Sequence, residues 1–168
     1  MKPGQNVAFN FDSSLLFDPS APPISSFSGE YLGLSNLTPY LVRVADVEFP
    51  TLEHAFQAMK SMRKEQWIEI SKIPNPGDAR RRGDGLLYPR PDWEEKKRFV
   101  MYKLLQEKFQ CTPYKNLLLE TWPRQLIEGN HWKDKYWGVY KGEGENWLGR
   151  LLMRVRLELI AENLVGLS

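Results

Sequence analysis

Apolar residues recur every three or four positions along much of the chain, which is the spacing of amphipathic helices. Polar residues fill the intervening positions, so each segment has one face suited to a protein core. The pattern predicts helices over about 51–61, from 92 to the break at Thr112–Pro113, from Pro113 through Leu119, and from Asn146 to Leu159.

Three of these helices begin at residues that suit a helix start. Thr51 can accept a hydrogen bond from a first-turn N–H as an N-cap. Asp92 is followed three residues later by Glu95, which is the pattern of a capping box. Pro113 suits the first helical position, where its missing N–H costs nothing.

The remaining segments predict few strands and two functional loops. Residues 40–49 alternate partly between apolar and polar positions, which favours a short strand or hairpin. Residues 75–93 and 129–147 are polar and rich in glycine and aromatic residues, so we expect loops there that carry the site. No β-α-β repetition is present, and the prediction is one α+β domain, helix-rich with a few short strands.

The division of the chain follows from its composition. Residues 18–28 are rich in proline and serine, which is typical of a surface loop. We expect a partly irregular lead-in over residues 1–26 and the domain over residues 27–168.

The polar face of the helix at 51–61 carries three functional side chains. Glu53, Gln57 and Lys60 project from one side, because positions seven apart differ by only about 20° around a helix. Two interpretations are open. The stripe is either the solvated face of an amphipathic helix or one wall of a site that offers a carboxylate, an amide and an amine.

A second group of candidates lies in the segment 130–138. Titratable and aromatic residues alternate there, and Asp134 is suited to act as a general base or to stabilise a positive anomeric carbon. The alternative is a solvated loop whose tryptophans cover the core. Five tryptophans lie in or beside polar segments, where their faces suit a planar base: Trp67, Trp93, Trp132, Trp137 and Trp147.

The run Arg80-Arg81-Arg82 is either an ordinary surface cluster or a phosphate clamp. Gly83 and Gly85 beside it would allow a backbone to approach an anion. His54 is expected to be structural, and Cys111 is assigned no role.

Composition narrows the class of protein. The 168 residues include 23 Lys and Arg against 21 Asp and Glu, a net charge of +2, which disfavours a general nucleic-acid binder. A single cysteine cannot form a disulfide within the chain, so we expect a reducing, cytoplasmic location. The cysteine and the two histidines do not have the spacing of a zinc site, and we expect no metal and no cofactor. No long apolar run predicts a membrane span.

Several separated blocks in one order resemble the YbiA-like, or NADAR, superfamily over roughly residues 27–160. The blocks are GEYLGLSNLTPY at 29–40, FPTLEHAFQAMKS at 49–61, PGDARRRG at 76–83, RPDWEEKKRFVMYKLLQEKF at 90–109 and LIEGNHWKDKYWGVYKGEGENWLGRLLMRVR at 126–156. An ordered set of this kind is more specific than one short motif.

The resemblance implies hydrolysis of an N-glycosidic bond. The expected substrate is a phosphorylated ribosylamino-pyrimidine intermediate of riboflavin biosynthesis. The alternatives are removal of ADP-ribose from guanine in nucleic acid, or non-catalytic binding of NAD or ADP-ribose. The expected partner is therefore a small phosphorylated ribosyl compound, with ADP-ribosylated nucleic acid as the second possibility, and the oligomeric state is left open.

The resemblance also assigns site residues by motif position. Glu53, Asp134 and Lys60 are the expected catalytic residues, with Lys60 as an alternative nucleophile that would form a Schiff base. Gly83-Asp84 replaces the Gly-Arg of many relatives, so phosphate binding is assigned to an arginine nearby. The expected substrate-binding residues are Asn36, Arg82, Arg90, Trp93, Trp137, Gly138 and Asn146.

Overall fold

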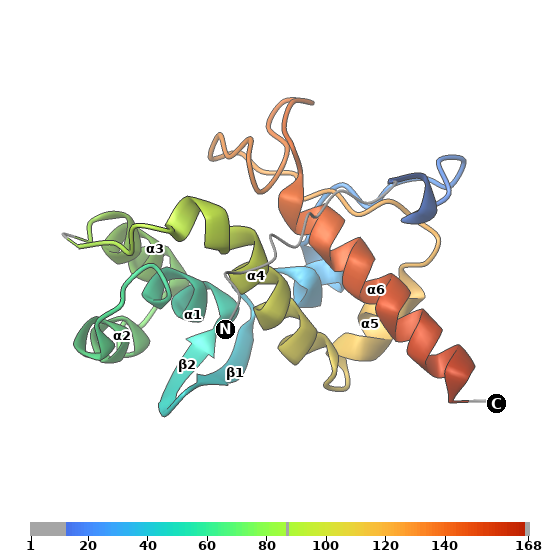
Figure 1. Ribbon diagram of the computed structural model, residues 1–168. Coiled ribbons are helices and arrows are strands. Elements are labelled where there is room, and N and C mark those ends of the chain that lie inside the picture. The colour runs from blue at the N-terminus through green and yellow to red at the C-terminus, as the bar shows by residue number, and fades with distance from the viewer. Residues whose placement is uncertain (1–12, 87, 167–168) are drawn as a thin grey trace.

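The computed structural model describes residues 13–86 and 88–166, and Figure 1 shows a helical domain with one small hairpin. Two 3-10 helices, Ser13–Leu15 and Gly29–Leu34, precede the antiparallel strands β1 (Pro39–Val44) and β2 (Val47–Thr51). The α-helices are α1 (Leu52–Ala58), α2 (Lys64–Ser71), α3 (Pro76–Asp84), α4 (Trp93–Phe109), α5 (Tyr114–Glu120) and α6 (Trp147–Val165).

The predicted α+β class is confirmed. The structure also contains two helices that were not predicted, α2 and α3. Residues 75–93 were expected to form a loop, but Pro76–Asp84 form α3. Only Ala79 and Gly83 of α3 are buried, so this helix has almost no apolar periodicity. Its signal is instead Asn75, whose side chain accepts a hydrogen bond from the Asp78 N–H at 2.9 Å. Helix α2, with Ile70 as its buried residue, was not predicted for the same reason.

The predicted helix starts are only partly correct. Thr51 caps α1, since its hydroxyl accepts a hydrogen bond from the His54 N–H at 3.3 Å. The capping box at Asp92 is wrong, because that side chain caps no N–H and pairs with Arg90 instead. Pro113 lies at the N-cap of α5, one position before the predicted one.

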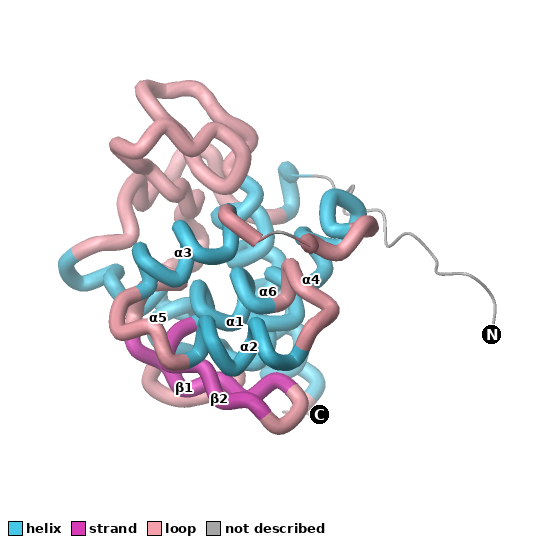
Figure 2. The backbone as a smooth tube through the Cα atoms, turned by 90° about the vertical axis from the view of Figure 1, so that its left-hand side faces the viewer, coloured by secondary structure: helices cyan, strands magenta, loops and turns pink. Residues whose placement is uncertain are grey.

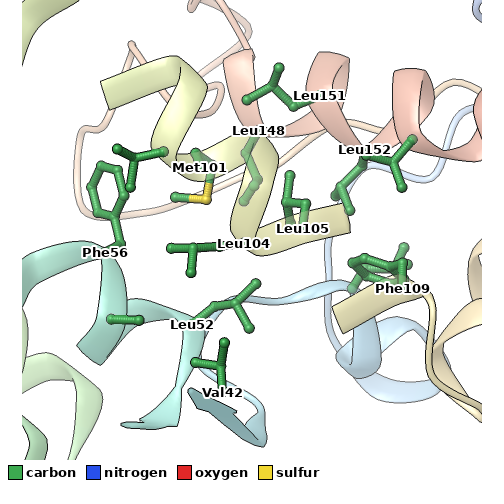
Figure 3. Close-up of a cluster of buried hydrophobic side chains, with 14 of the residues drawn as sticks. Val42, Leu52, Phe56, Met101, Leu104, Leu105, Phe109, Leu148, Leu151 and Leu152 are labelled. Atoms are coloured by element: carbon green, nitrogen blue, oxygen red, sulfur yellow. The ribbon is translucent and has the colours of Figure 1, made fainter. Parts of the chain in front are cut away.

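The hydrophobic core lies where α4 and α6 meet α1 and the hairpin (Figure 3). Leu105 from α4 and Leu151 and Leu152 from α6 are fully buried there. Phe49 of β2 is also fully buried, and Val42 opposite it is nearly so. This packing holds α1 in the middle of the molecule, between the hairpin, α2 and α3 (Figure 2). None of the described helices is long and apolar enough to cross a membrane.

The described residues before residue 27 pack against the rest of the domain. Leu16 and Ile24 belong to the core, and Ile24 forms a parallel bridge with Leu126. The boundary at residue 26 stays a prediction, and residues 1–12 of that lead-in lie outside the described part. Residues 13–26 therefore contribute to the same hydrophobic core as the helices.

Arg156 of α6 holds this segment through buried hydrogen bonds. Its guanidinium is fully buried and donates to the carbonyl oxygens of Leu16 at 2.7 Å, Arg124 at 2.8 Å and Thr121 at 3.1 Å. Burial lowers the pKa of Arg156 to about 10, so the group remains charged at neutral pH. One side chain thus joins α6 to two segments that are remote in sequence.

Replacing Arg156 by methionine should destabilise the fold. The substitution keeps the aliphatic volume but leaves buried carbonyl oxygens without donors, which we expect to cost about 3 kcal/mol. Arg150→Met on the exposed side of α6 is the matched control and should change stability by less than about 0.5 kcal/mol. Urea unfolding of the two variants measures this, and equal midpoints would contradict the role of Arg156.

Candidate active site

A cavity of about 1030 Å³ opens between α1, α3, the first turns of α4 and the loop that leads into α6. This loop, coloured orange in Figure 1, lies beyond the N-terminal end of α6. Residues 35–37, which follow the second 3-10 helix, complete the lining. The volume is at the upper end of the range for small-molecule sites.

The polar stripe of α1 forms one wall of this cavity. Glu53, Gln57 and Lys60 all line it. Glu53 is 9% exposed and Gln57 is 3% exposed, so the interpretation of the stripe as a solvated face is wrong. The stripe is covered because α3 packs against α1 over its polar side.

Glu53 is a buried carboxyl group at the bottom of this wall. Its Oε1 accepts a hydrogen bond from Gln57 Nε2 at 2.7 Å. Burial raises the pKa of Glu53, while the bond from Gln57 and the charges of Arg80 and Lys60 oppose that rise. The environment therefore holds an ionisable carboxyl group in a place from which water is largely excluded.

Asp134 faces the cavity from the opposite side, on the loop. Its Oδ1 accepts from the backbone N–H groups of Tyr136 at 3.0 Å and Trp137 at 2.8 Å. Its Oδ2 lies 3.6 Å from the Arg80 guanidinium of α3. Asn130 holds the backbone of Asp134 by two hydrogen bonds, to its N–H at 3.0 Å and its carbonyl at 2.7 Å. Asp134 is thus fixed on one oxygen, and its other oxygen is turned toward Arg80.

Lys60 closes the stripe near the mouth of the cavity. Its Nζ lies 2.6 Å from Asp84 Oδ1, at the last residue of α3. The side chain is only 14% exposed, whereas that of Asp84 is 59% exposed. An amine in such an ion pair must release its partner and its proton before it can act as a nucleophile.

Two of the tryptophans and one phenylalanine form the apolar part of the lining. Phe56 lies between Trp93 and Trp137, with ring centroids 5.0 Å and 5.3 Å away. Trp132 also lines the cavity and is 42% exposed. Trp67 and Trp147 lie outside the lining, so the prediction of a base-facing role does not fit them.

The arginine run divides between the site and the outer surface. Arg80 and Arg81 line the cavity, but Arg82 turns away and pairs with Glu69 of α2 at 2.5 Å. Arg90 pairs with Asp92 at 2.6 Å and is also outside the lining. Arg80 and Arg81 thus reach the cavity and Arg82 and Arg90 do not, so the assignment of phosphate contacts to Arg82 or Arg90 stays a prediction that this geometry does not favour.

The remaining predicted binding residues separate in the same way. Asn36 lines the cavity, and its buried Oδ1 has no hydrogen-bond partner among the described groups. Asn146 and Gly138 lie outside the lining and are structural. The Asn146 side chain accepts from the Glu128 N–H at 3.0 Å and donates to the Leu126 carbonyl at 2.9 Å. A Cβ on Gly138 would lie 2.2 Å from the Glu128 carbonyl oxygen.

Glu128 is the residue of the cavity that was not predicted. The segment before Glu128 has no apolar periodicity, so the spacing of residues did not indicate a functional role for it. Its position inside the 126–156 block was the signal that could have identified it. Burial raises its pKa to about 7, with a further contribution from the negative charges of Asp134 and Glu53. Glu53, Asp134 and Glu128 therefore share one cavity, which Asp84 and Glu94 also line.

Two other titratable residues take no part in the site. His54 is fully buried, with its ring nitrogens 2.8 Å from Thr51 Oγ1 and 3.0 Å from the Ile73 carbonyl oxygen. This agrees with its predicted structural role. Cys111 is exposed and lies outside the lining. Among the described residues, no group of three or more potential ligands could hold a metal ion.

The family model of the NADAR domain matches residues 20–160. The chain belongs to the NADAR domain family. It is 39% identical over 140 residues to a protein of Escherichia coli strain K12 named N-glycosidase YbiA, covering 82% of this chain and 87% of that protein. The NMR structure of Escherichia coli YbiA matches with a TM-score of 0.77 at 36% identity, covering 89% of this chain and 92% of that one.

A maize relative is a much longer chain. The chain is 35% identical over 145 residues to a maize protein named Riboflavin biosynthesis protein PYRR, chloroplastic. The match covers 75% of this chain and 23% of the maize protein. The likeness therefore concerns one part of that protein.

Gly83 gives a direct test of how α3 is seated on the site. A Cβ there would lie 2.1 Å from Gln57 Oε1 and 2.8 Å from Gln57 Cβ, so rotation of the glutamine alone does not relieve the contact. Gly83→Ala should destabilise the protein by about 1–3 kcal/mol despite the better helix propensity of alanine.

Gly85→Ala is the matched control, since its Cβ would meet the Arg81 carbonyl oxygen at an ordinary 3.5 Å. Thermal unfolding measures both variants. If the two glycines served instead as a flexible anion-binding turn, both variants would keep wild-type stability and lose ligand affinity to the same degree.

Proposed function

We propose that this protein is an N-glycosidase that hydrolyses the ribosyl C–N bond of phosphorylated ribosylamino-pyrimidines. The observation that carries the proposal is a cavity lined by the buried carboxyl group of Glu53, by the partly buried Asp134 and Glu128 and by aromatic rings, together with arginine and lysine side chains. The names of the relatives from Escherichia coli and maize support the same reaction and the same area of metabolism.

The carboxyl groups provide what this bond cleavage needs. Departure of the base leaves positive charge on the anomeric carbon, which a nearby carboxylate stabilises, and a second carboxylate can activate the attacking water. Glu53 and Asp134 are assigned these two roles. Arg80 lies near both of them: its charge opposes the rise that burial causes in the pKa of Glu53, and its guanidinium lies 3.6 Å from Asp134 Oδ2.

The aromatic residues and Asn36 are suited to hold the pyrimidine. Trp93 and Trp137 offer partly buried ring faces, and a planar base packs against such surfaces with little loss of conformational freedom. The free Oδ1 of Asn36 can accept a hydrogen bond from a base or sugar N–H or O–H group. A polar contact is thereby available beside the stacking surface.

The phosphate is assigned to the cationic edge of the cavity. Arg81, Lys97, Lys133 and Lys135 all line it. A net charge of +2 for the whole chain gives little general attraction for anions, so these local charges must supply it. Guanidinium groups bind phosphate oxygens through two parallel hydrogen bonds, which favours Arg81 for this contact.

Lys60 offers a second route, through a Schiff base with the opened sugar. That route requires the Lys60–Asp84 pair to open, whereas direct hydrolysis leaves the pair in place. Borohydride added during turnover distinguishes the two. A trapped sugar phosphate on Lys60 would favour the amine route, and an unmodified protein with full product release would favour the carboxylates.

The activity is tested by incubating the protein with a ribosylamino-pyrimidine phosphate and, separately, with an ADP-ribosylated guanine oligonucleotide. Mass detection of free base and sugar phosphate follows each reaction. Release from the first substrate supports the proposal. Release from the second alone would make the protein a hydrolase of ADP-ribosylated nucleic acid, and binding without release from either would make it a nucleotide reader.

Glu53→Gln and Asp134→Asn should each lower kcat by about 100-fold or more, because they remove charge that the transition state requires. Glu143→Gln, on an exposed part of the same loop outside the lining, is the control and should keep the wild-type rate. Wild-type rates in both cavity variants would disprove the carboxylate assignment.

Arg81→Gln should raise KM for the phosphorylated substrate about tenfold and leave KM for the dephosphorylated compound unchanged. The neighbouring substitution Arg82→Gln is the control, since Arg82 pairs with Glu69 away from the cavity. Steady-state kinetics on both compounds provides the comparison. An equal rise in KM for the two compounds would contradict a phosphate contact.

A further inference from the structure

The backbone of Glu128 is held by hydrogen bonds on both its N–H and its carbonyl group. Its N–H donates to Asn146 Oδ1 at 3.0 Å, and its carbonyl oxygen accepts from the Val139 N–H at 2.8 Å. Gly138 lies directly against it, with no room for a side chain. The backbone of Glu128 is therefore fixed between the start of α6 and the far side of the loop.

The side chain lines the cavity with one oxygen unused. Glu128 Oε2 is buried and has no hydrogen-bond partner among the described groups. A buried polar atom without a partner costs free energy, and proteins usually satisfy it. An oxygen buried without a partner disfavours the charged form of the carboxyl group, because ionisation would leave buried negative charge without a donor.

Several cations of the cavity are engaged with other carboxylates. Lys60 pairs with Asp84, Arg80 with Asp134, and Lys97 with Glu94. Within the described residues, no ion pair reaches Glu128. The Glu128 carboxyl group is instead near Glu53 and Asp134, whose negative charges disfavour its ionisation.

We propose that Glu128 is the general acid that protonates the departing nitrogen of the base, a role that rests on the proposed function. As the C–N bond breaks, its electron pair goes to the nitrogen, which takes the proton from the Glu128 carboxyl group and leaves as an amine. The water oxygen bonds to the anomeric carbon. The water gives one proton to the carboxylate that activates it, and solvent exchange returns a proton to Glu128.

This division of work follows from the environments of the three groups. An amino-pyrimidine is a poor leaving group as an anion, so a proton donor assists its departure. Asp134 accepts two backbone N–H bonds on Oδ1 and faces Arg80 with Oδ2, so donors lie beside both of its oxygens. Glu128 has no such donor to its Oε2, and burial with nearby negative charge raises its pKa to about 7.

The assignment predicts the pH dependence of the reaction. A general acid must carry its proton, so kcat/KM falls as pH rises above about 7, the pKa of Glu128. The charged and titratable groups that share the cavity with it are Glu53 from α1, Lys60 just after α1, Arg80, Arg81 and Asp84 from α3, Glu94 and Lys97 from α4, and His131, Lys133, Asp134, Lys135 and Tyr136 from its own loop.

The test compares Glu128→Gln with the wild-type protein on two leaving groups. One substrate is the ribosylamino-pyrimidine phosphate, and the other is 4-nitrophenyl riboside 5-phosphate, whose nitrophenolate departs without a proton. Glu128→Gln should lose about 100-fold or more in kcat on the first and less than about fivefold on the second. Equal losses on both substrates, or no loss on the first, would overturn the general-acid role.

The wild-type protein supplies a second measurement that does not depend on the variant folding. Its kcat/KM should show the alkaline decline on the amino-pyrimidine substrate and lack it on the nitrophenyl substrate. The same decline on both would overturn the proposal. Wild-type protein that leaves the amino-pyrimidine substrate intact would instead disprove the proposed function, and the assignment of Glu128 with it.

Discussion

The arrangement of the whole molecule depends on the complete burial of α1. All seven of its residues are buried, although three of them are Glu53, His54 and Gln57. A polar group inside a protein must find partners there, so the elements around α1 have to supply them. The core covers its apolar side, the hairpin and Ile73 satisfy His54, and α3 covers the polar side without filling the space above it. The cavity is the part of this polar side that no protein group occupies.

Charge in the cavity is arranged by local pairing. Each carboxyl group has a different neighbourhood: Glu53 accepts from an amide, Asp134 from two backbone N–H groups, and Glu128 Oε2 from no described group. Such differences set carboxyl groups of the same kind to different protonation states at one pH. A mechanism that needs both a carboxylate and a carboxylic acid can therefore be built from ordinary side chains, without a metal ion in any of its steps.

The sequence predicts the parts of this structure that have apolar periodicity. Helices α1, α4 and α6 were expected because their apolar residues repeat at helical spacing, and the stripe of Glu53, Gln57 and Lys60 followed from that geometry. Helix α3 escaped prediction because it docks through a small residue and a glycine. Its docking also decides which arginine faces the site, since consecutive residues point about 100° apart, and no periodicity distinguishes Arg81 from Arg82. Glu128 depends on long-range contacts with Val139 and Asn146, which spacing along the chain does not encode.

The loop that carries Asp134 is anchored at its base and not at its tip. Asn130, Asp134, Val139 and Asn146 make the hydrogen bonds that fix it, whereas residues 131–133 are exposed and lie on the rim of the cavity. Substitutions at the tip alter what the rim touches and leave the carboxyl groups where they are. A scaffold built in this way can exchange one ribosyl substrate for another over evolutionary time while the bond-breaking apparatus is inherited unchanged, and the tip is the natural place to redirect its selectivity by design.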